Sequence, residues 1–237
     1  MSNYTNLFQQ FIAHTNEKET LKNELSILLK NHKFDSLLDI GCGTGAIIEQ
    51  IIPNFKKISL LDIEDRLKDD IKNNPKVEFI QKDFLQFETD KKFDVILAAY
   101  VLWEIPYKEW DAFFENTQNL LQPNGIMVII DEYSENKYDN PFFNFNTNIQ
   151  PYNDYPGLSE FLSKKGFDYK IKKFKSQIFA KDELEMYEVL KFFFQLPKQR
   201  DFYQKSKQQI INNLKTKCNN TGCIINMQHI IYKIKLQ

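Results

Sequence analysis

Three of the seven glycines in this 237-residue chain lie within five positions, at Gly41, Gly43 and Gly45. Glycine adopts backbone conformations that other residues avoid, so a cluster of glycines marks a sharp turn or a close approach of the backbone to another group. The cluster follows an apolar run at 36–40 and precedes a stretch with helical spacing. A glycine-rich turn between a strand and a helix predicts an α/β fold with a ligand site at that turn.

The apolar pattern of the chain supports this fold class. Strands are predicted at 36–40, 58–62, 77–80, 93–99 and 126–131, with helices near 45–52, 64–72 and 107–121 between them. Continuous apolar strands that alternate with helices are typical of a parallel sheet covered on both faces. We therefore predict a Rossmann-like, doubly wound, mostly parallel sheet of seven strands with helices on both faces.

Further elements are predicted on either side of this region. The N-terminal part shows helical spacing at 4–12 and 17–30, and Asn16 with Glu19 forms a plausible capping box for the second helix. The C-terminal part predicts helices at 157–165, 181–196 and 199–214, and strands at 169–179 and 223–235. We expect one domain over 1–237, with a helical cap at 1–34, a ligand-binding core at 35–132, and an aromatic substrate loop followed by the rest of the sheet at 133–237. The segment 132–156 has neither helical nor strand periodicity and is rich in aromatic residues, so we expect it to cover a site.

Composition excludes several classes. Lysine and arginine total 31 and aspartate and glutamate 32, so no basic surface for a nucleic acid is indicated. No run of about 18 apolar residues predicts a membrane span, and the polar N-terminus does not resemble a signal peptide. Three cysteines, Cys42, Cys218 and Cys223, are too few for a disulfide framework, so a cytoplasmic protein with unbonded cysteines is expected. The spacing of Cys218 and Cys223 also indicates no metal site.

The spacing of the glycines also fits the dinucleotide pattern G-x-G-x-x-A, so the glycines alone do not identify the ligand. Asp39 lies two residues before the first glycine, where its carboxylate would repel a pyrophosphate and attract a ligand that carries an ammonium and a sulfonium group. Asp62 ends the second strand, where a carboxylate can accept both ribose hydroxyls, although it could also cap the helix that follows. Asp83 and Phe84 follow the third strand, where the acid could accept from the exocyclic amine of an adenine and the ring could lie against the base. A turn role is the alternative for Asp83. Ala99 and Tyr100 end the fourth strand at the level of the reacting group.

These pieces resemble the class I S-adenosylmethionine-dependent methyltransferases. The resemblance is carried, in the order and spacing of that family, by LLDIGCGTG (37–45), LLDIED (60–65), QKDF (81–84), FDVILAAYVLWEIP (93–106) and LLQPNGIMVIIDE (120–132). It implies S-adenosylmethionine as the cofactor and no metal. The cofactor-binding residues it implies are Asp39, Gly41, Cys42, Gly43, Gly45, Asp62, Ile63, Asp83, Phe84, Ala99 and Tyr100.

A second resemblance concerns the methyl acceptor. The spaced set Tyr4, Phe8, Phe11, His14 and Glu17 is similar to the N-terminal segment of histamine N-methyltransferases, and Glu104 and Tyr100 depart from that pattern. It implies a pocket for a small amine or imidazole compound, with aromatic walls suited to a cation. The substrate-binding residues it suggests are Tyr4, Phe8, Glu17, Trp103, Glu104, Phe142, Phe143 and Asn226. The aromatic residues could equally pack helices onto the sheet, and Glu17 could serve the helix dipole alone.

Other functions stay open. A dinucleotide oxidoreductase would use the same glycine pattern, and Tyr133 and Lys137 have the spacing of its catalytic pair, but they lie in the irregular loop. A non-catalytic cofactor-binding protein and a methyltransferase for a macromolecule are the remaining alternatives. The sequence identifies no general base and no oligomeric state, and His229 in the last strand is expected to be a packing residue.

Overall fold

The computed structural model describes residues 3–30, 33–132, 157–194 and 197–235. Its contacts divide the chain into two compact units. The first, which we call the helical unit, contains Met1–Thr20, Ser134–Asn153 and Lys175–Gln228; the second, the sheet unit, contains Leu21–Tyr133, Asp154–Phe174 and His229–Gln237. The expectation of a single domain therefore stays a prediction. The predictions for 133–156, including Phe142, Phe143, Tyr133 and Lys137, lie outside the described residues, as does the side chain of Tyr4.

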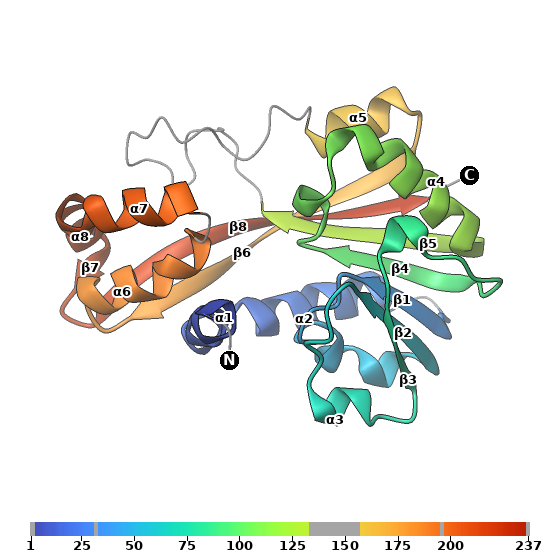
Figure 1. The fold of residues 1–237 in the computed structure, drawn as a ribbon, viewed down its shortest axis with the longest axis horizontal. Helices are drawn as coiled ribbons and strands as arrows, with labels where there is room; N and C mark the ends of the chain where they lie inside the picture. Colours follow the sequence, from blue (N-terminus) through green and yellow to red (C-terminus); the bar gives the residue numbers. More distant parts are fainter. Residues whose placement is uncertain (1–2, 31–32, 133–156, 195–196, 236–237) are drawn as a thin grey trace. The chain divides into compact units, whose positions relative to one another are not determined.

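The described strands form a mostly parallel sheet in the order β3-β2-β1-β4-β5-β8-β6 (Figure 1). Strands β1 to β5 pair in parallel, and β8 pairs antiparallel with β5. A further strand, β7, pairs with β8 outside this order. The strands are β1 (Ser36–Ile40), β2 (Lys57–Asp62), β3 (Val77–Gln81), β4 (Phe93–Ala99), β5 (Leu121–Glu132), β6 (Asp168–Ala180), β7 (Cys218–Asn219) and β8 (Gly222–Lys235). The predicted Rossmann-like sheet is confirmed, and β7 is a two-residue addition.

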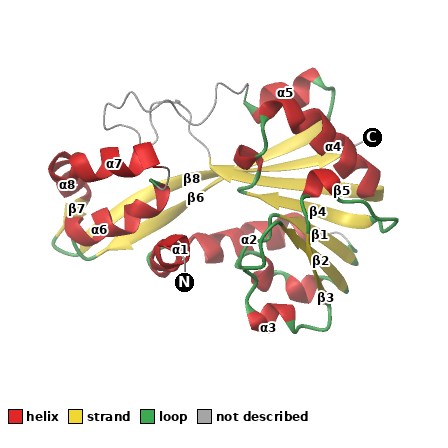
Figure 2. Ribbon diagram, in the orientation of Figure 1, coloured by secondary structure: helices red, strands yellow, loops and turns green. Residues whose placement is uncertain are grey.

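Helices cover both faces of the sheet unit (Figure 2). On one face, α4 (Trp110–Leu120) and α5 (Leu158–Lys164) pack Phe113, Phe114 and Phe161 against the strands. On the other face, α2 (Glu17–Leu29) contributes Leu21, Leu25 and Leu29, and α3 (Asp69–Lys72) contributes Ile71. Successive residues of β1 and β4 enter opposite cores, which explains why their sequences are apolar without interruption.

Two predicted helices of this unit are shorter than expected. The stretch 45–52 contains only 3₁₀ turns, at Ile48–Gln50 and Ile52–Asn54, because β-branched isoleucines and Pro53 disfavour a continuous α-helix. The stretch 64–72 is helical only in α3. Further 3₁₀ turns occupy Phe84–Gln86, Leu102–Glu104 and Tyr107–Glu109.

The helical unit has a core of its own. It contains α1 (Asn3–Ala13), α6 (Glu183–Leu190), α7 (Pro197–Lys205), α8 (Lys207–Leu214) and the 3₁₀ turns Lys191–Phe193 and Lys215–Lys217. The rings of Tyr187 and Tyr203 stack at 4.5 Å, and each hydroxyl donates to the backbone carbonyl of the other residue. Both buried hydroxyls are thereby satisfied, so two tyrosines can occupy an apolar core.

The N-terminal segment is bonded to β6 within this unit. Thr15 forms an antiparallel bridge with Ile178, and the Gln177 amide donates to the Asn16 side-chain oxygen at 2.7 Å. The prediction that Asn16 caps α2 through its side chain is therefore wrong, because its side-chain oxygen accepts from the backbone amide of Gln177 on β6 instead. Thr15 takes the role instead, since its hydroxyl oxygen accepts from the Glu17 amide at 3.2 Å.

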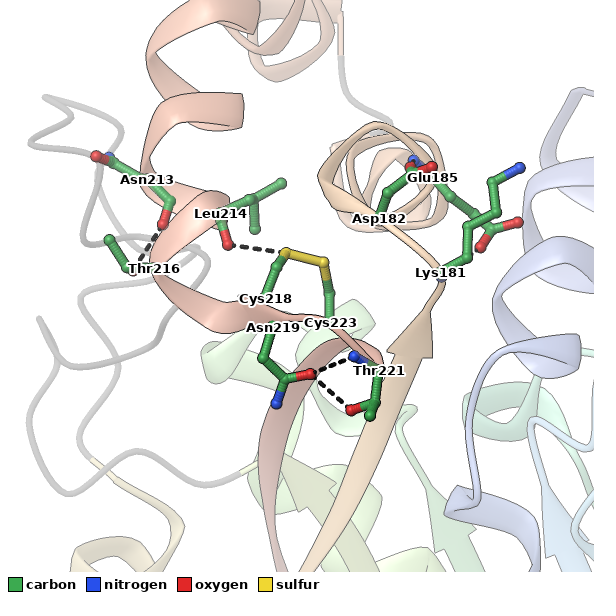
Figure 3. The surroundings of a disulfide bond; sticks show 10 residues. All are labelled: Lys181, Asp182, Glu185, Asn213, Leu214, Thr216, Cys218, Asn219, Thr221 and Cys223. Atoms are coloured by element: carbon green, nitrogen blue, oxygen red, sulfur yellow. Dashed lines mark hydrogen bonds between the residues drawn. A yellow bond between two sulfur atoms is a disulfide. The ribbon is translucent and has the colours of Figure 1, made fainter.

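Cys218 and Cys223 form a disulfide that closes the β7–β8 hairpin (Figure 3). The expectation that these cysteines are unbonded is corrected by their pairing opposite each other across this hairpin. Asn219 and Thr221 complete the tight turn, with the Asn219 side-chain oxygen accepting from both the amide and the hydroxyl of Thr221.

Candidate functional site

The glycine cluster forms a turn at the carboxyl end of β1. Gly41, Gly43 and Gly45 have φ angles of 72°, 53° and 76°, in the left-handed region that favours glycine. The amides of Gly41 and Cys42 both donate to the carbonyl of Leu61 on the neighbouring strand, at 2.8 and 3.2 Å. The conformation is thus fixed by β2 and requires these glycines.

The space beside each glycine differs. A Cβ atom on Gly41 would lie 2.6 Å from a Val101 methyl, and one on Gly45 would lie 2.6 Å from Ile71. A Cβ atom on Gly43 would have no neighbour within 4 Å. A side chain at Gly41 or Gly45 would therefore meet neighbouring side chains inside the protein, whereas Gly43 presents its backbone to open space that a ligand can enter.

Asp62 connects the end of β2 to this turn. Its carboxylate accepts from the Gly43 amide at 2.8 Å with Oδ2 and from the Glu64 amide at 2.9 Å with Oδ1. The side chain is buried, with 5% of the residue exposed. No helix begins at Ile63, because α3 starts only at Asp69, so Asp62 does not cap a helix as the alternative expects. The bond to Gly43 instead ties the carboxylate to the glycine turn.

A second carboxylate, that of Asp39, is buried on β1, two residues before Gly41. Burial raises its pKa well above the ordinary value, and the charge of Asp62 adds to this effect. Burial and the nearby acid thus favour the neutral form of Asp39, and a positively charged neighbour would favour its ionised form. The same burial and charges raise the pKa of the Cys42 thiol, so Cys42 stays protonated and is a poor nucleophile.

Arg66 lies beside the candidate site and is not among the residues predicted from the sequence. Its guanidinium lies 3.7 Å from Asp62 Oδ1 and 3.4 Å from Glu64 Oε2. It also opposes the rise in the pKa of Glu104, which is caused first by partial desolvation and then by the charges of Asp62 and Glu64. Glu104 therefore shares the electrostatic environment of Asp62. The sequence feature that could indicate this role is an arginine four residues after Asp62, the acid that ends β2.

The residues predicted at the adenine edge differ in exposure. Ile63 follows Asp62 and is 59% exposed, which is unusual for isoleucine. Asp83 accepts from the Leu85 amide at 3.0 Å, which is the alternative turn role. The ring of Phe84 is buried against Phe113 at a centroid distance of 5.1 Å, so it belongs to the core.

The end of β4 lies beside the glycine turn, because Val101 contacts Gly41. Tyr100 has a φ of 55°, and its amide donates to the Ile130 carbonyl at 2.8 Å. A left-handed conformation is strained for tyrosine and is found most often at functional sites. Trp103, two residues beyond Val101, is 46% exposed. The chain around Val101 thus contains four of the predicted site residues: Ala99, Tyr100, Trp103 and Glu104.

The Tyr100 side chain contacts the histidine that the sequence predicts to be a packing residue. The Tyr100 hydroxyl lies 2.9 Å from Nδ1 of His229, which is fully buried on β8. The His229 ring stacks on Phe174 with centroids 4.8 Å apart. His229 therefore does pack in the core, and it also bonds to a residue at the site.

The other predicted substrate residues belong to the helical unit. The ring of Phe8 contacts Phe192 at 5.6 Å, in the packing role that is the alternative for the N-terminal aromatics. Glu17 is buried in the first turn of α2. Asn226 accepts from the Gln177 side chain at 3.0 Å. Within this unit the structure brings Asn226 and Asn16 to the same residue, Gln177.

The described part of the chain has no group of three or more His, Cys, Asp or Glu side chains that could hold a metal ion. None of the described helices is long and apolar enough to cross a membrane.

Comparisons with known proteins agree with this geometry. Residues 37–125 match a methyltransferase domain family. Nodulation protein S of Sinorhizobium fredii is 29% identical over 124 residues, which cover 49% of this chain and 56% of the relative. Malonyl-[acyl-carrier protein] O-methyltransferase 2 of Ilyobacter polytropus is 30% identical over 99 residues, covering 39% of this chain and 38% of the relative. The chain thus spans little more than half, or less, of these relatives.

A solved structure extends the likeness to almost the whole fold. The crystal structure of the N-methyltransferase NodS from Bradyrhizobium japonicum superposes with a TM-score of 0.55. The match covers 93% of this chain and 97% of that chain at 15% identity. At this identity the likeness concerns the fold.

Proposed function

Because residues 37–125 match a methyltransferase domain family, we propose that this chain is a class I S-adenosylmethionine-dependent methyltransferase and that it transfers a methyl group to a nitrogen of a small amine or imidazole compound. The observation that carries the proposal is the turn at Gly43, which is open on one side and bonded to the buried carboxylate of Asp62.

The residues present fit this cofactor. An open approach at Gly43 suits a ligand that lies against the backbone, and a side chain there would occupy the same space. Asp62 is held by the Gly43 and Glu64 amides and would accept from the ribose hydroxyls. A positive ammonium or sulfonium group beside Asp39 would favour the ionised form of this buried acid, whereas a pyrophosphate would oppose it. This electrostatic preference argues against a nicotinamide dinucleotide.

The adenine end would lie against the exposed side chain of Ile63. Burying this side chain under the base would contribute about 1–2 kcal/mol. The Phe84 ring is committed to the core, so the proposed contribution of Asp83 and Phe84 to base recognition comes from the Asp83 side chain and the backbone of the turn.

When bound, the cofactor supplies an electrophilic methyl group on a positive sulfur. The protein then has to align the accepting atom with the methyl carbon and sulfur and to exclude water. The strand end at Ala99 and Tyr100 holds the loop beside Gly41, and the exposed Trp103 offers a face to a cationic acceptor. Glu104 is the carboxylate of the sheet unit proposed to bind an ammonium or imidazole group, and the same role for Glu17 stays a prediction.

O-methyl transfer is the second candidate, and it is supported by the name of the Ilyobacter relative. Binding without turnover and a macromolecular acceptor are further alternatives. Calorimetry with S-adenosylmethionine tests the cofactor. Release of S-adenosylhomocysteine with a panel of amines, imidazoles and phenols tests the reaction. Binding without release for any acceptor would favour a non-catalytic protein, and absence of binding would contradict the proposal.

A further inference from the structure

The hydrogen bond between the Tyr100 hydroxyl and His229 is not explained by cofactor binding. Tyr100 follows Ala99 at the end of β4, and the next residue, Val101, contacts Gly41 of the glycine turn. The Tyr100 backbone is fixed by its bond to the Ile130 carbonyl, and its side chain is fixed by the bond to His229. Both the backbone and the side chain of this strained tyrosine are thus held in place, and the residue after it lies beside the glycine turn.

His229 is built to hold this hydroxyl in one place. Its ring is fully buried, stacks on Phe174, and lies on β8 opposite Glu132 in the strand register. Burial lowers its pKa to about 4, so the imidazole is neutral at neutral pH. A neutral imidazole in this position is a poor sink for a proton released by the acceptor, and it can orient the hydroxyl in either tautomer.

We propose that the Tyr100 hydroxyl, oriented by His229 as a positioning residue, accepts a hydrogen bond from the group that is methylated. A phenolic oxygen can make a second hydrogen bond in addition to the one with His229. The proposal rests on the proposed function and deepens it. It restricts the acceptor to compounds that carry a donor, an N–H or O–H, at or beside the reacting atom.

The experiment uses the full chain saturated with S-adenosylhomocysteine. Binding of histamine and phenethylamine is measured by calorimetry for the wild type, Tyr100→Phe, His229→Gln and His229→Leu. Phenethyltrimethylammonium, which keeps the charge and has no N–H, is the control ligand. Tyr232→Phe is the matched control variant, because Tyr232 lies on the same strand as His229 and its hydroxyl bonds to the Ser159 side chain.

We expect Tyr232→Phe to bind S-adenosylhomocysteine like the wild type, and the amine affinity of every variant is measured at a concentration of S-adenosylhomocysteine that saturates that variant. Tyr100→Phe and His229→Leu should weaken the protic amine at least about tenfold, since one hydrogen bond is lost. His229→Gln should recover part of this loss, because an amide can also bond to the hydroxyl. Tyr232→Phe should behave as the wild type, and the quaternary ligand should not distinguish the variants.

A second readout follows the imidazole itself. In protein with ¹⁵N-labelled histidine, the protic amine should shift the His229 resonances in the wild type and not in Tyr100→Phe. The inference is overturned if neither protic probe binds or shifts these resonances in protein that binds S-adenosylhomocysteine, or if Tyr100→Phe binds the probes normally. Failure of the wild type to bind S-adenosylhomocysteine would instead overturn the proposed function.

Discussion

The Gly43 amide donates to the Asp62 carboxylate over 2.8 Å, so the end of β2 holds the one glycine of the turn that faces open space. The same carboxylate accepts from Glu64 and lies near Arg66. Asp62 therefore shapes the loop and provides charge to the site, and substitutions can separate these two roles.

Asp62→Asn should keep the fold and weaken S-adenosylmethionine binding. The amide oxygen of asparagine can still accept from Gly43, but the negative charge is lost. Loss of a charge-assisted hydrogen bond corresponds to about 1.5–3 kcal/mol, so we expect the Kd to rise about tenfold or more. Calorimetry measures the Kd, and thermal unfolding checks the fold.

Asp94→Asn is the control for this substitution. Asp94 also accepts from backbone amides, those of Asp35 and Ser36, and it does so at the start of β4 rather than at the end of β2. It should lower stability and leave the Kd unchanged. Equal affinity of Asp62→Asn and the wild type would remove Asp62 from the cofactor site.

Gly43→Val should abolish cofactor binding while the chain still folds. The valine would fill the open space above the loop, and the left-handed backbone would cost about 1–2 kcal/mol. Gly166→Val is a close control, because Gly166 has a φ of 75° and a Cβ atom there would also have no neighbour within 4 Å. If both variants bind S-adenosylmethionine like the wild type, the loop assignment is wrong.

Much of the sheet unit could be predicted from the sequence because its signals are local. Strands β1 and β4 have the predicted ends, since each is a continuous apolar run with a turn after it. The prediction of a helix near 45–52 is wrong because an i, i+3 pattern of isoleucines does not distinguish α from 3₁₀ turns. Pro53 is the sequence feature that indicates an interrupted helix.

The site could be predicted only in part because side-chain direction depends on contacts between distant segments. The glycine turn and Asp62 follow a fixed spacing along the chain. By contrast, His229 reaches Tyr100 across 129 positions, and the Phe84 ring points to the core rather than away from it. Arg66 and Asn16 also acquire their partners only when β2 and β6 are in place.

Asp131→Asn should stabilise the protein at neutral pH. Burial raises the pKa of Asp131 from 3.8 to about 6, so the native state holds a proton that the unfolded chain loses first. The free energy of unfolding of the wild type should thus fall as the pH rises from about 4 to 6, by up to about 3 kcal/mol from this group. The variant should lack this fall in urea titrations, whereas Asp168→Asn, at an exposed position on β6, should retain it.

His229→Gln should also change the pH dependence of the free energy of unfolding over this range, with the opposite sign to Asp131→Asn. Burial lowers the pKa of His229 from 6.5 to about 4, so on acidification the unfolded chain takes up a proton before the native state does. This group should lower the free energy of unfolding as the pH falls from about 6.5 to 4, by up to about 3 kcal/mol. The glutamine variant should lose that dependence in urea titrations over this range.

Tyr232→Phe controls for lost packing and hydrogen bonding on β8, and it should lower stability by a similar amount at every pH. An unchanged acid slope in His229→Gln would show that His229 is protonated in the native state. In the double variant His229→Gln with Asp131→Asn, both contributions to the pH dependence should disappear. The two contributions should be independent, because His229 lies opposite Glu132 in the strand register and therefore on the other face of the sheet from Asp131. The wild-type profile in this range is therefore expected to be the sum of two opposing terms, and only the single variants reveal them.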